Sequence, residues 1–176
     1  MLKGKINGIE IESRDIKPTH IKELTTFTLF VNGRAVGRAY YFSGRGFYTP
    51  WLEIDYDPWP RTEGIEDDLF SFIYDFLPRG SKLFVTYLKD LETRKMLLQG
   101  YNPADTPLGF SLLKAGFTWF KDWYFPEGGN EGVPKLQANK AFTENDETRE
   151  LRELLGEVKR DEVRKYIEEK LAKRKS

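Results

Sequence analysis

Residues 47–88 read FYTPWLEIDYDPWPRTEGIEDDLFSFIYDFLPRGSKLFVTYL, and their hydrophobic period changes twice. Apolar and polar residues alternate along 47–56, which predicts a strand. The spacing then becomes helical, and residues 82–88 return to a short apolar strand. The residues on the helical stripe are Leu69, Phe72, Ile73 and Phe76. A strand, helix, strand succession forces a parallel crossover, so this stretch predicts a mixed α/β domain.

The residues before this stretch predict antiparallel strands. Residues 6–16 alternate around the Asn7-Gly8 turn, which is typical of a short hairpin. Residues 25–31 and 35–42 are rich in β-branched and aromatic side chains and are joined by Asn32-Gly33. Asn-Gly is the strongest short-range hairpin signal, because both residues tolerate the positive φ of a type I′ turn.

The residues after it alternate between helix and strand patterns. We expect helices over 89–99 and 108–115 and strands over 117–125 and 135–142. The fold class is therefore α/β (α+β), a mixed and mostly antiparallel sheet flanked by helices. We divide the chain into a domain over 1–142 and a charged helical C-terminal extension over 143–176.

The extension predicts two helices, because its two apolar stripes are out of phase and Gly156 and Asp161 lie between them. The first stripe is Leu151, Leu154, Leu155 and Val158, and the second is Val163, Ile167 and Leu171. We expect these helices either to pack on their own domain or to form a homodimer contact.

Composition excludes several classes of function. Lys+Arg and Asp+Glu balance at 28 each, so we expect neither nucleic acid nor a membrane as partner. The absence of Cys and the single His exclude thiolate metal sites, a Cys nucleophile and a His-rich metal site, and we expect no metal. The start of the chain lacks a signal-peptide pattern, and no run approaches the roughly 20 apolar residues of a membrane helix. We expect a cytoplasmic protein.

The segment between strand and helix, Asp57 to Glu66, is the main candidate for chemistry. A loop that opens a helix presents unpaired backbone N–H groups at the positive end of the helix dipole, and such a turn can hold a pyrophosphate. Gly64 would allow close backbone approach, and Arg61 would add a charged hydrogen bond.

Arg61-x-x-Gly64-x-Glu66 resembles the Gln/Arg-x-x-Gly-x-Gly/Ala turn of the GNAT superfamily of acyl-CoA acyltransferases, and Gly116-Phe117 resembles the end of that superfamily's next conserved helix. The resemblance covers residues 25–142. It implies acetyl-CoA or another acyl-CoA as cosubstrate, with the pyrophosphate on Arg61, Thr62, Glu63, Gly64, Ile65 and Glu66. Residues 106–139 also resemble an uncharacterised, mainly archaeal family within this superfamily.

The resemblance implies direct attack of a small-molecule or peptide amine on the thioester, which requires a base. Glu53 and Asp55 are the candidates, because they alternate with Leu52 and Ile54 and should share the face opposite the helices. The superfamily's proton-donating Tyr is replaced by Leu112, and Tyr101, Tyr124 or Tyr87 would have to substitute.

The departures at Leu112 and Glu66 leave two further functions open. One is a catalytically inactive GNAT-like protein that binds CoA or a nucleotide. The other is an assembly module driven by the C-terminal helices.

Overall fold

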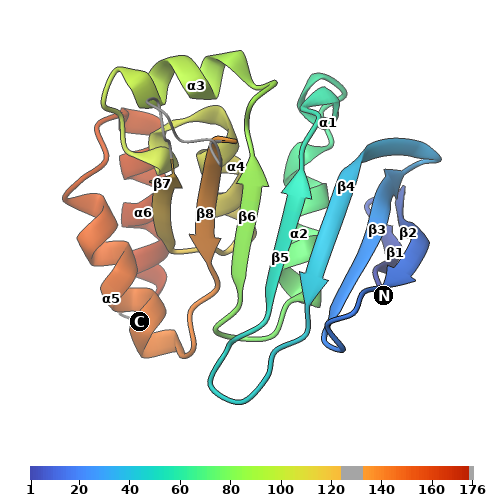
Figure 1. Cartoon of the computed structure of the whole chain (residues 1–176). Helices are drawn as coiled ribbons and strands as arrows, with labels where there is room; N and C mark the ends of the chain where they lie inside the picture. Colours follow the sequence, from blue (N-terminus) through green and yellow to red (C-terminus); the bar gives the residue numbers. More distant parts are fainter. Residues whose placement is uncertain (124–132, 175–176) are drawn as a thin grey trace.

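The computed structural model describes residues 1–123 and 133–174 (Figure 1). The described residues form one eight-stranded sheet in the order β1-β2-β3-β4-β5-β6-β8-β7. The strands are β1 (Lys3–Ile6), β2 (Ile9–Pro18), β3 (Leu24–Val31), β4 (Arg34–Phe42), β5 (Trp51–Asp55), β6 (Lys82–Thr86), β7 (Trp119–Trp123) and β8 (Lys135–Asn139). The mixed, mostly antiparallel sheet expected from the sequence is confirmed.

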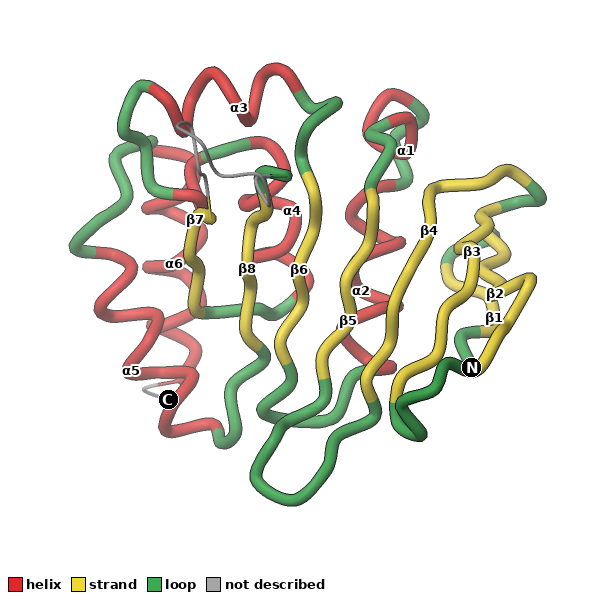
Figure 2. Tube along the Cα trace, in the orientation of Figure 1, coloured by secondary structure: helices red, strands yellow, loops and turns green. Residues whose placement is uncertain are grey.

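The helices connect the later strands and close the chain (Figure 2). They are α1 (Trp59–Thr62), α2 (Glu66–Phe76), α3 (Leu91–Leu98), the 3-10 turn η1 (Pro103–Asp105), α4 (Pro107–Ala115), α5 (Glu144–Leu155) and α6 (Asp161–Arg174). The short helix α1 is absent from the sequence prediction. Pro60 occupies the first turn of this helix, where no amide donor is required.

Two hairpins form where Asn-Gly predicted them. Asn7 and Gly8 have φ values of 47° and 82°, and Asn32 and Gly33 have values of 50° and 77°. These left-handed values are those of type I′ turns, whose twist matches that of the flanking strands. The β1–β2 and β3–β4 pairs are accordingly antiparallel.

The predicted crossover is also confirmed, since β5 and β6 pair in parallel and α2 connects them. The sequence predicts strands at both β7 and β8, and the two pair antiparallel. However, β8 also pairs antiparallel with β6, so it lies between β6 and β7. The last strand of the chain is thereby inserted inside the sheet.

The sheet has one covered face and one helix-free face. In Figure 1 the viewer looks onto the helix-free side of β4, β5, β6 and β8, with α2 and α4 behind. Leu52, Ile54 and Tyr56 are buried among the helices, whereas Glu53 and Asp55 alternate with them and face the other way. The alternation predicted for this strand is confirmed.

Helices α5 and α6 pack on α4 and η1 through a second apolar cluster. Its buried members are Ala104, Phe110, Leu113, Leu151, Leu154, Val158, Val163, Ile167 and Leu171. Both predicted apolar stripes therefore pack on their own domain, because each faces the other C-terminal helix and α4. The predicted break is confirmed, since α5 ends at Leu155 and α6 begins at Asp161. None of the helices within residues 1–123 and 133–174 combines the length and hydropathy needed to cross a bilayer.

Candidate functional site

The turn that leads into α2 uses its own backbone amides. The N–H of Glu63 donates to the carbonyl of Trp59 at 3.1 Å, that of Gly64 to Arg61 at 3.0 Å, and that of Ile65 to Pro60 at 2.9 Å. Three of the amides expected to cradle a diphosphate are therefore occupied. Gly64, with φ of 74°, serves the tight turn from α1 into α2.

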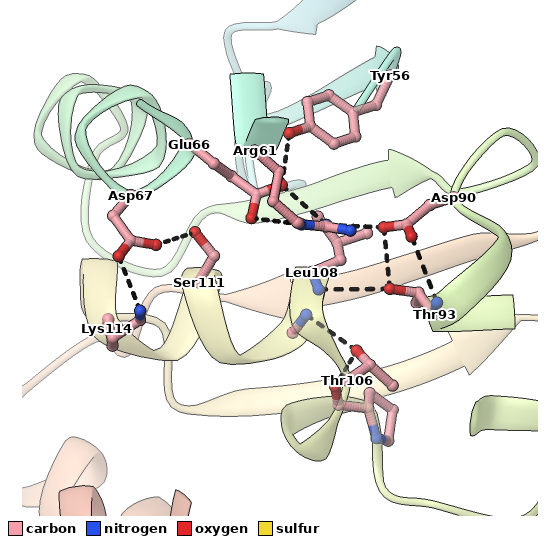
Figure 3. Close-up of polar contacts among 12 residues, drawn as sticks. Tyr56, Arg61, Glu66, Asp67, Asp90, Thr93, Thr106, Leu108, Ser111 and Lys114 are labelled. Carbon is pink, nitrogen blue, oxygen red and sulfur yellow. Dashed lines mark hydrogen bonds and ion pairs between the residues drawn. The ribbon is translucent and has the colours of Figure 1, made fainter. Parts of the chain in front are cut away.

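Arg61 is held by two carboxylates. Its Nε and Nη2 atoms donate to the Glu66 carboxylate at 3.0 Å and 2.8 Å, and Nη2 also donates to Asp90 Oδ2 at 2.7 Å (Figure 3). The geometry to Glu66 is the bidentate fork that a guanidinium forms with a carboxylate. The side chain of Glu66 thus satisfies the arginine that the sequence assigned to a phosphate.

The Arg61 pairs belong to a longer buried network (Figure 3). The Tyr56 hydroxyl donates to Glu66 Oε2 at 2.6 Å. The Thr93 hydroxyl donates to Asp90 Oδ2 at 2.9 Å and accepts from the N–H of Leu108 at 3.3 Å. The network therefore joins the end of β5 to the first turns of α2, α3 and α4.

Burial and the neighbouring charges shift the pKa values of the ionisable groups in this network. Burial raises the pKa of the Glu66 carboxyl, against the opposing effect of Arg61 and Tyr56. Burial lowers the pKa of Arg61, but the hydrogen bonds to Asp90 and Glu66 outweigh it and the net pKa is raised. Burial and the Glu66 charge raise the pKa of Tyr56. With two carboxylates around one guanidinium, the network gives no net attraction for an anion.

A cavity of about 330 Å³ lies beside the network, between α2, α4 and the start of α6. Its cations have carboxylate partners: Lys114 Nζ lies 2.7 Å from Asp67, and Arg160 lies 3.3 Å from Glu162. The Ser111 hydroxyl also donates to Asp67, at 2.6 Å. This cavity is polar, and the cationic side chains that line it form ion pairs with carboxylates of the same cavity.

The larger cavity is a groove of about 830 Å³ on the helix-free face of the sheet. It is bounded by the β4–β5 hairpin, the centre of β5, β6 and β8, and the chain after β8. Its lining residues are Phe42, Phe47, Tyr48, Thr49, Trp51, Glu53, Gly80, Lys82, Phe84, Trp123, Val133, Lys135, Asn139 and Phe142. We call this set the open-face groove.

Strand register arranges the groove floor in two rows. Phe42, Trp51, Lys82 and Asn139 are neighbours on β4, β5, β6 and β8. In the next row, Glu53 is paired with Phe84, and Phe84 with Gln137. The Phe42 and Trp51 rings stack with centroids 5.8 Å apart, and Phe84 lies edge-on to Trp51 at 6.4 Å. The floor is thus an aromatic platform with polar groups at fixed positions.

The polar groups of the groove differ in their partners. Lys135 Nζ lies 2.6 Å from Glu53 Oε1. Gln137 accepts from Trp123 Nε1 at 2.8 Å and donates to Asn139 Oδ1 at 2.9 Å. Lys82 is exposed and has no ion-pair partner among residues 1–123 and 133–174. Its ammonium is the groove's unpaired charge in the described part of the chain.

The structure separates the predicted catalytic residues. Glu53 lies in the groove, whereas Asp55 is exposed at the end of β5 and accepts from the Thr86 hydroxyl at 3.1 Å. Tyr101 follows α3, its ring lies 5.9 Å from Lys159 Nζ, and it is not among the residues that line the groove. Tyr124 lies outside the described residues. Leu112, at the position of the superfamily's Tyr, is fully buried in the core.

The residues predicted to bind the pyrophosphate also lie in different surroundings. Arg61 and Glu66 are bonded to each other, and Thr62 and Glu63 are exposed on the outer side of the turn. Sequence reasoning missed the groove, although one signal pointed to it. The alternation of β5 that placed Glu53 opposite the helices also places Trp51 on the same face.

Comparison with known proteins identifies a family and a similar solved structure, both of unknown function. Among solved structures, the chain is similar to a protein of unknown function, AQ1966, from Aquifex aeolicus VF5. The TM-score is 0.67 with 32% sequence identity, over 91% of this chain and 88% of that one. No curated protein matches. A family model described as a protein of unknown function (DUF1122) matches residues 7–165, and the chain therefore belongs to the DUF1122 family.

Proposed function

We propose that this protein is a GNAT-like ligand-binding protein whose ligand occupies the open-face groove and which does not bind acyl-CoA at the α2 turn. One contrast carries the proposal. In the Arg61 turn, the guanidinium is bonded to the Glu66 and Asp90 carboxylates and three backbone amides are bonded within the turn. The groove on the helix-free face is large and is lined by aromatic side chains.

The groove has the properties of a small-molecule site. Its volume of about 830 Å³ falls within the usual range for ligand pockets, which combine apolar walls with few polar groups. The β4–β5 hairpin presents Phe47 and Tyr48 to solvent at 104% and 76% exposure, and Phe142 across the groove is 60% exposed. Clustered exposed aromatic side chains mark interaction sites, because leaving them in water gives up stabilisation.

The test is a binding screen with matched variants. A chemically diverse fragment panel is screened by ligand-observed NMR against the wild type, Trp51→Ala and Phe84→Ala. We expect a set of fragments to bind the wild type and to lose most of their signal with both variants, because both rings form the groove floor. Leu91→Ala, which removes an exposed side chain on α3, is the control and should keep every hit.

Saturating hits should also raise the melting temperature, since a ligand at about a hundred times its Kd adds about 2.7 kcal/mol to the free energy of unfolding. Hits that bind all three variants as well as the wild type would contradict the proposal.

Acyl transfer from acyl-CoA to an amine is the second candidate, and the divergence of β5 and β6 favours it. Beyond Asp55 the chain turns towards β4, where the N–H of Asp57 donates to Val36 at 3.0 Å. Beyond Thr86 it turns towards β8, where the N–H of Tyr87 donates to Pro134 at 3.2 Å. The separated end of β5 leads into the Arg61 turn, to which the GNAT resemblance assigns the cosubstrate. In this candidate Glu53 is the base for the acceptor amine.

Acetyl-CoA separates the two candidates. Because Arg61 is neutralised, we expect about 1 mM acetyl-CoA to leave the melting temperature of the wild type unchanged, where a ligand far above its Kd would raise it by several degrees. An increase of that size, together with CoA release in the presence of an amine panel, would favour acyl transfer over groove binding.

A further inference from the structure

We propose that the ligand of the open-face groove is a small planar aromatic anion, with its acidic group at Lys82 and its rings on the Trp51–Phe84 platform. This inference rests on the proposed function and names the chemical class of the ligand.

The charge follows from how the groove's ionic side chains are paired. Lys135 and Glu53, which both line the groove, neutralise each other at 2.6 Å. Lys82 lies one row away, between Trp51 and Asn139, and has no ion-pair partner in the described ranges. In a groove lined mainly by apolar side chains, an ammonium without an ion-pair partner complements one carboxylate, sulfonate or phosphate.

The shape follows from the rings. Phe42 and Trp51 stack at an interplanar angle of 22°, and Phe84 stands at 82° to Trp51. Aromatic rings fixed in this way offer both stacking and edge-to-face positions to another ring. A flexible alkyl chain would gain only its area of contact and would lose rotamer freedom on binding, so the platform favours a planar ring system.

The same charge count argues against a nucleic-acid strand. Proteins that bind single strands combine stacking aromatic residues with a positive groove that follows many phosphates. Here Glu53 lies on the groove floor, Asp55 follows it on the same face, and the chain as a whole has no net charge. In the described part of the groove, one ammonium without an ion-pair partner suits a ligand with a single acidic group.

The experiment measures dissociation constants for three probes of similar size by isothermal titration calorimetry. The probes are 2-naphthoate, its neutral analogue 2-naphthylmethanol, and decanoate as an aliphatic anion. For the wild type we expect 2-naphthoate to bind about 10-fold more tightly than either of the others, since one good charge contact changes affinity by about this factor.

Lys82→Gln should weaken 2-naphthoate about 10-fold and leave 2-naphthylmethanol unchanged. Lys95→Gln, which removes an exposed ammonium from α3, is the matched control and should change neither. Lys82 is exposed, so its replacement keeps the fold intact.

The outcomes separate this inference from the proposed function. Equal affinities for naphthoate in the wild type and Lys82→Gln would overturn the anion assignment, and tighter binding of decanoate would overturn the aromatic one. Salt-sensitive binding of an oligouridylate that competes with naphthoate would also overturn the inference, because it would show that the groove binds a nucleic-acid strand. In each of these cases the proposed function stands if Trp51→Ala still removes fragment binding. If Trp51→Ala and Phe84→Ala leave every ligand bound, the proposed function itself fails.

Discussion

Replacement of Arg61 by leucine is expected to lower the free energy of unfolding by about 3–5 kcal/mol, because it leaves two buried carboxylates without their cation. The side chains of Glu66 and Asp90 are only 7% and 3% exposed, so water cannot take the place of the guanidinium. Urea denaturation followed by circular dichroism at neutral pH measures the loss. Arg79→Leu, at an exposed position after α2, is the control and should change stability by less than about 0.5 kcal/mol.

A triple variant tests whether the loss comes from uncompensated charge. Arg61→Leu combined with Glu66→Gln and Asp90→Asn removes all three charges and keeps similar volumes. Because the triple variant leaves no buried charge without a partner, it should recover most of the loss. A single-variant loss below about 1 kcal/mol would show that the guanidinium is not committed to Glu66 and Asp90. Arg61 would then be free for a phosphate, and the acyl-CoA candidate would gain support.

This network also marks the limit of what the sequence could predict. The Arg61-x-x-Gly64 turn was found, and its place between β5 and α2 is confirmed. Its partner Asp90 lies 29 residues further along the chain, at the N-cap of α3, and the fold brings it beside Arg61. A spacing pattern within ten residues carries no information on such a contact. The arginine was therefore assigned to a ligand, although the chain supplies its partners.

Local signals predicted the fold more fully than the site. The Asn-Gly turns fix two hairpins through the positive φ of their own residues, and alternation along β5 fixes which side chains face the helices. The groove is different, since it needs the insertion of β8 beside β6. That insertion places Asn139 opposite Lys82 and brings Lys135 Nζ within 2.6 Å of Glu53 Oε1, over separations of more than fifty residues. Strand order in a sheet depends on long-range packing, which cannot be predicted from the local hydrophobic period of the sequence.

Asp105 is a residue for which the sequence suggested no role, and its replacement by alanine should be strongly destabilising. It is fully buried, and its carboxylate accepts from the N–H groups of Lys159 at 2.9 Å and Arg160 at 3.1 Å. These amides lie in the connection between α5 and α6. Each hydrogen bond to a charged group contributes about 1.5–3 kcal/mol, so we expect Asp105→Ala to lower the free energy of unfolding by about 3 kcal/mol.

The loss should begin in the C-terminal helices, because the Asp105 carboxylate in η1 holds the connection between α5 and α6. Hydrogen exchange of Asp105→Ala should show faster exchange in α5 and α6 than in β3 to β6. Asp105→Asn keeps one acceptor oxygen and should lose about half as much stability. Asp161→Ala, which removes an exposed carboxylate at the first residue of α6, should stay within about 1 kcal/mol of the wild type. Uniform exchange throughout the fold would show instead that α5 and α6 unfold together with the sheet, so that the two apolar clusters form one cooperative unit.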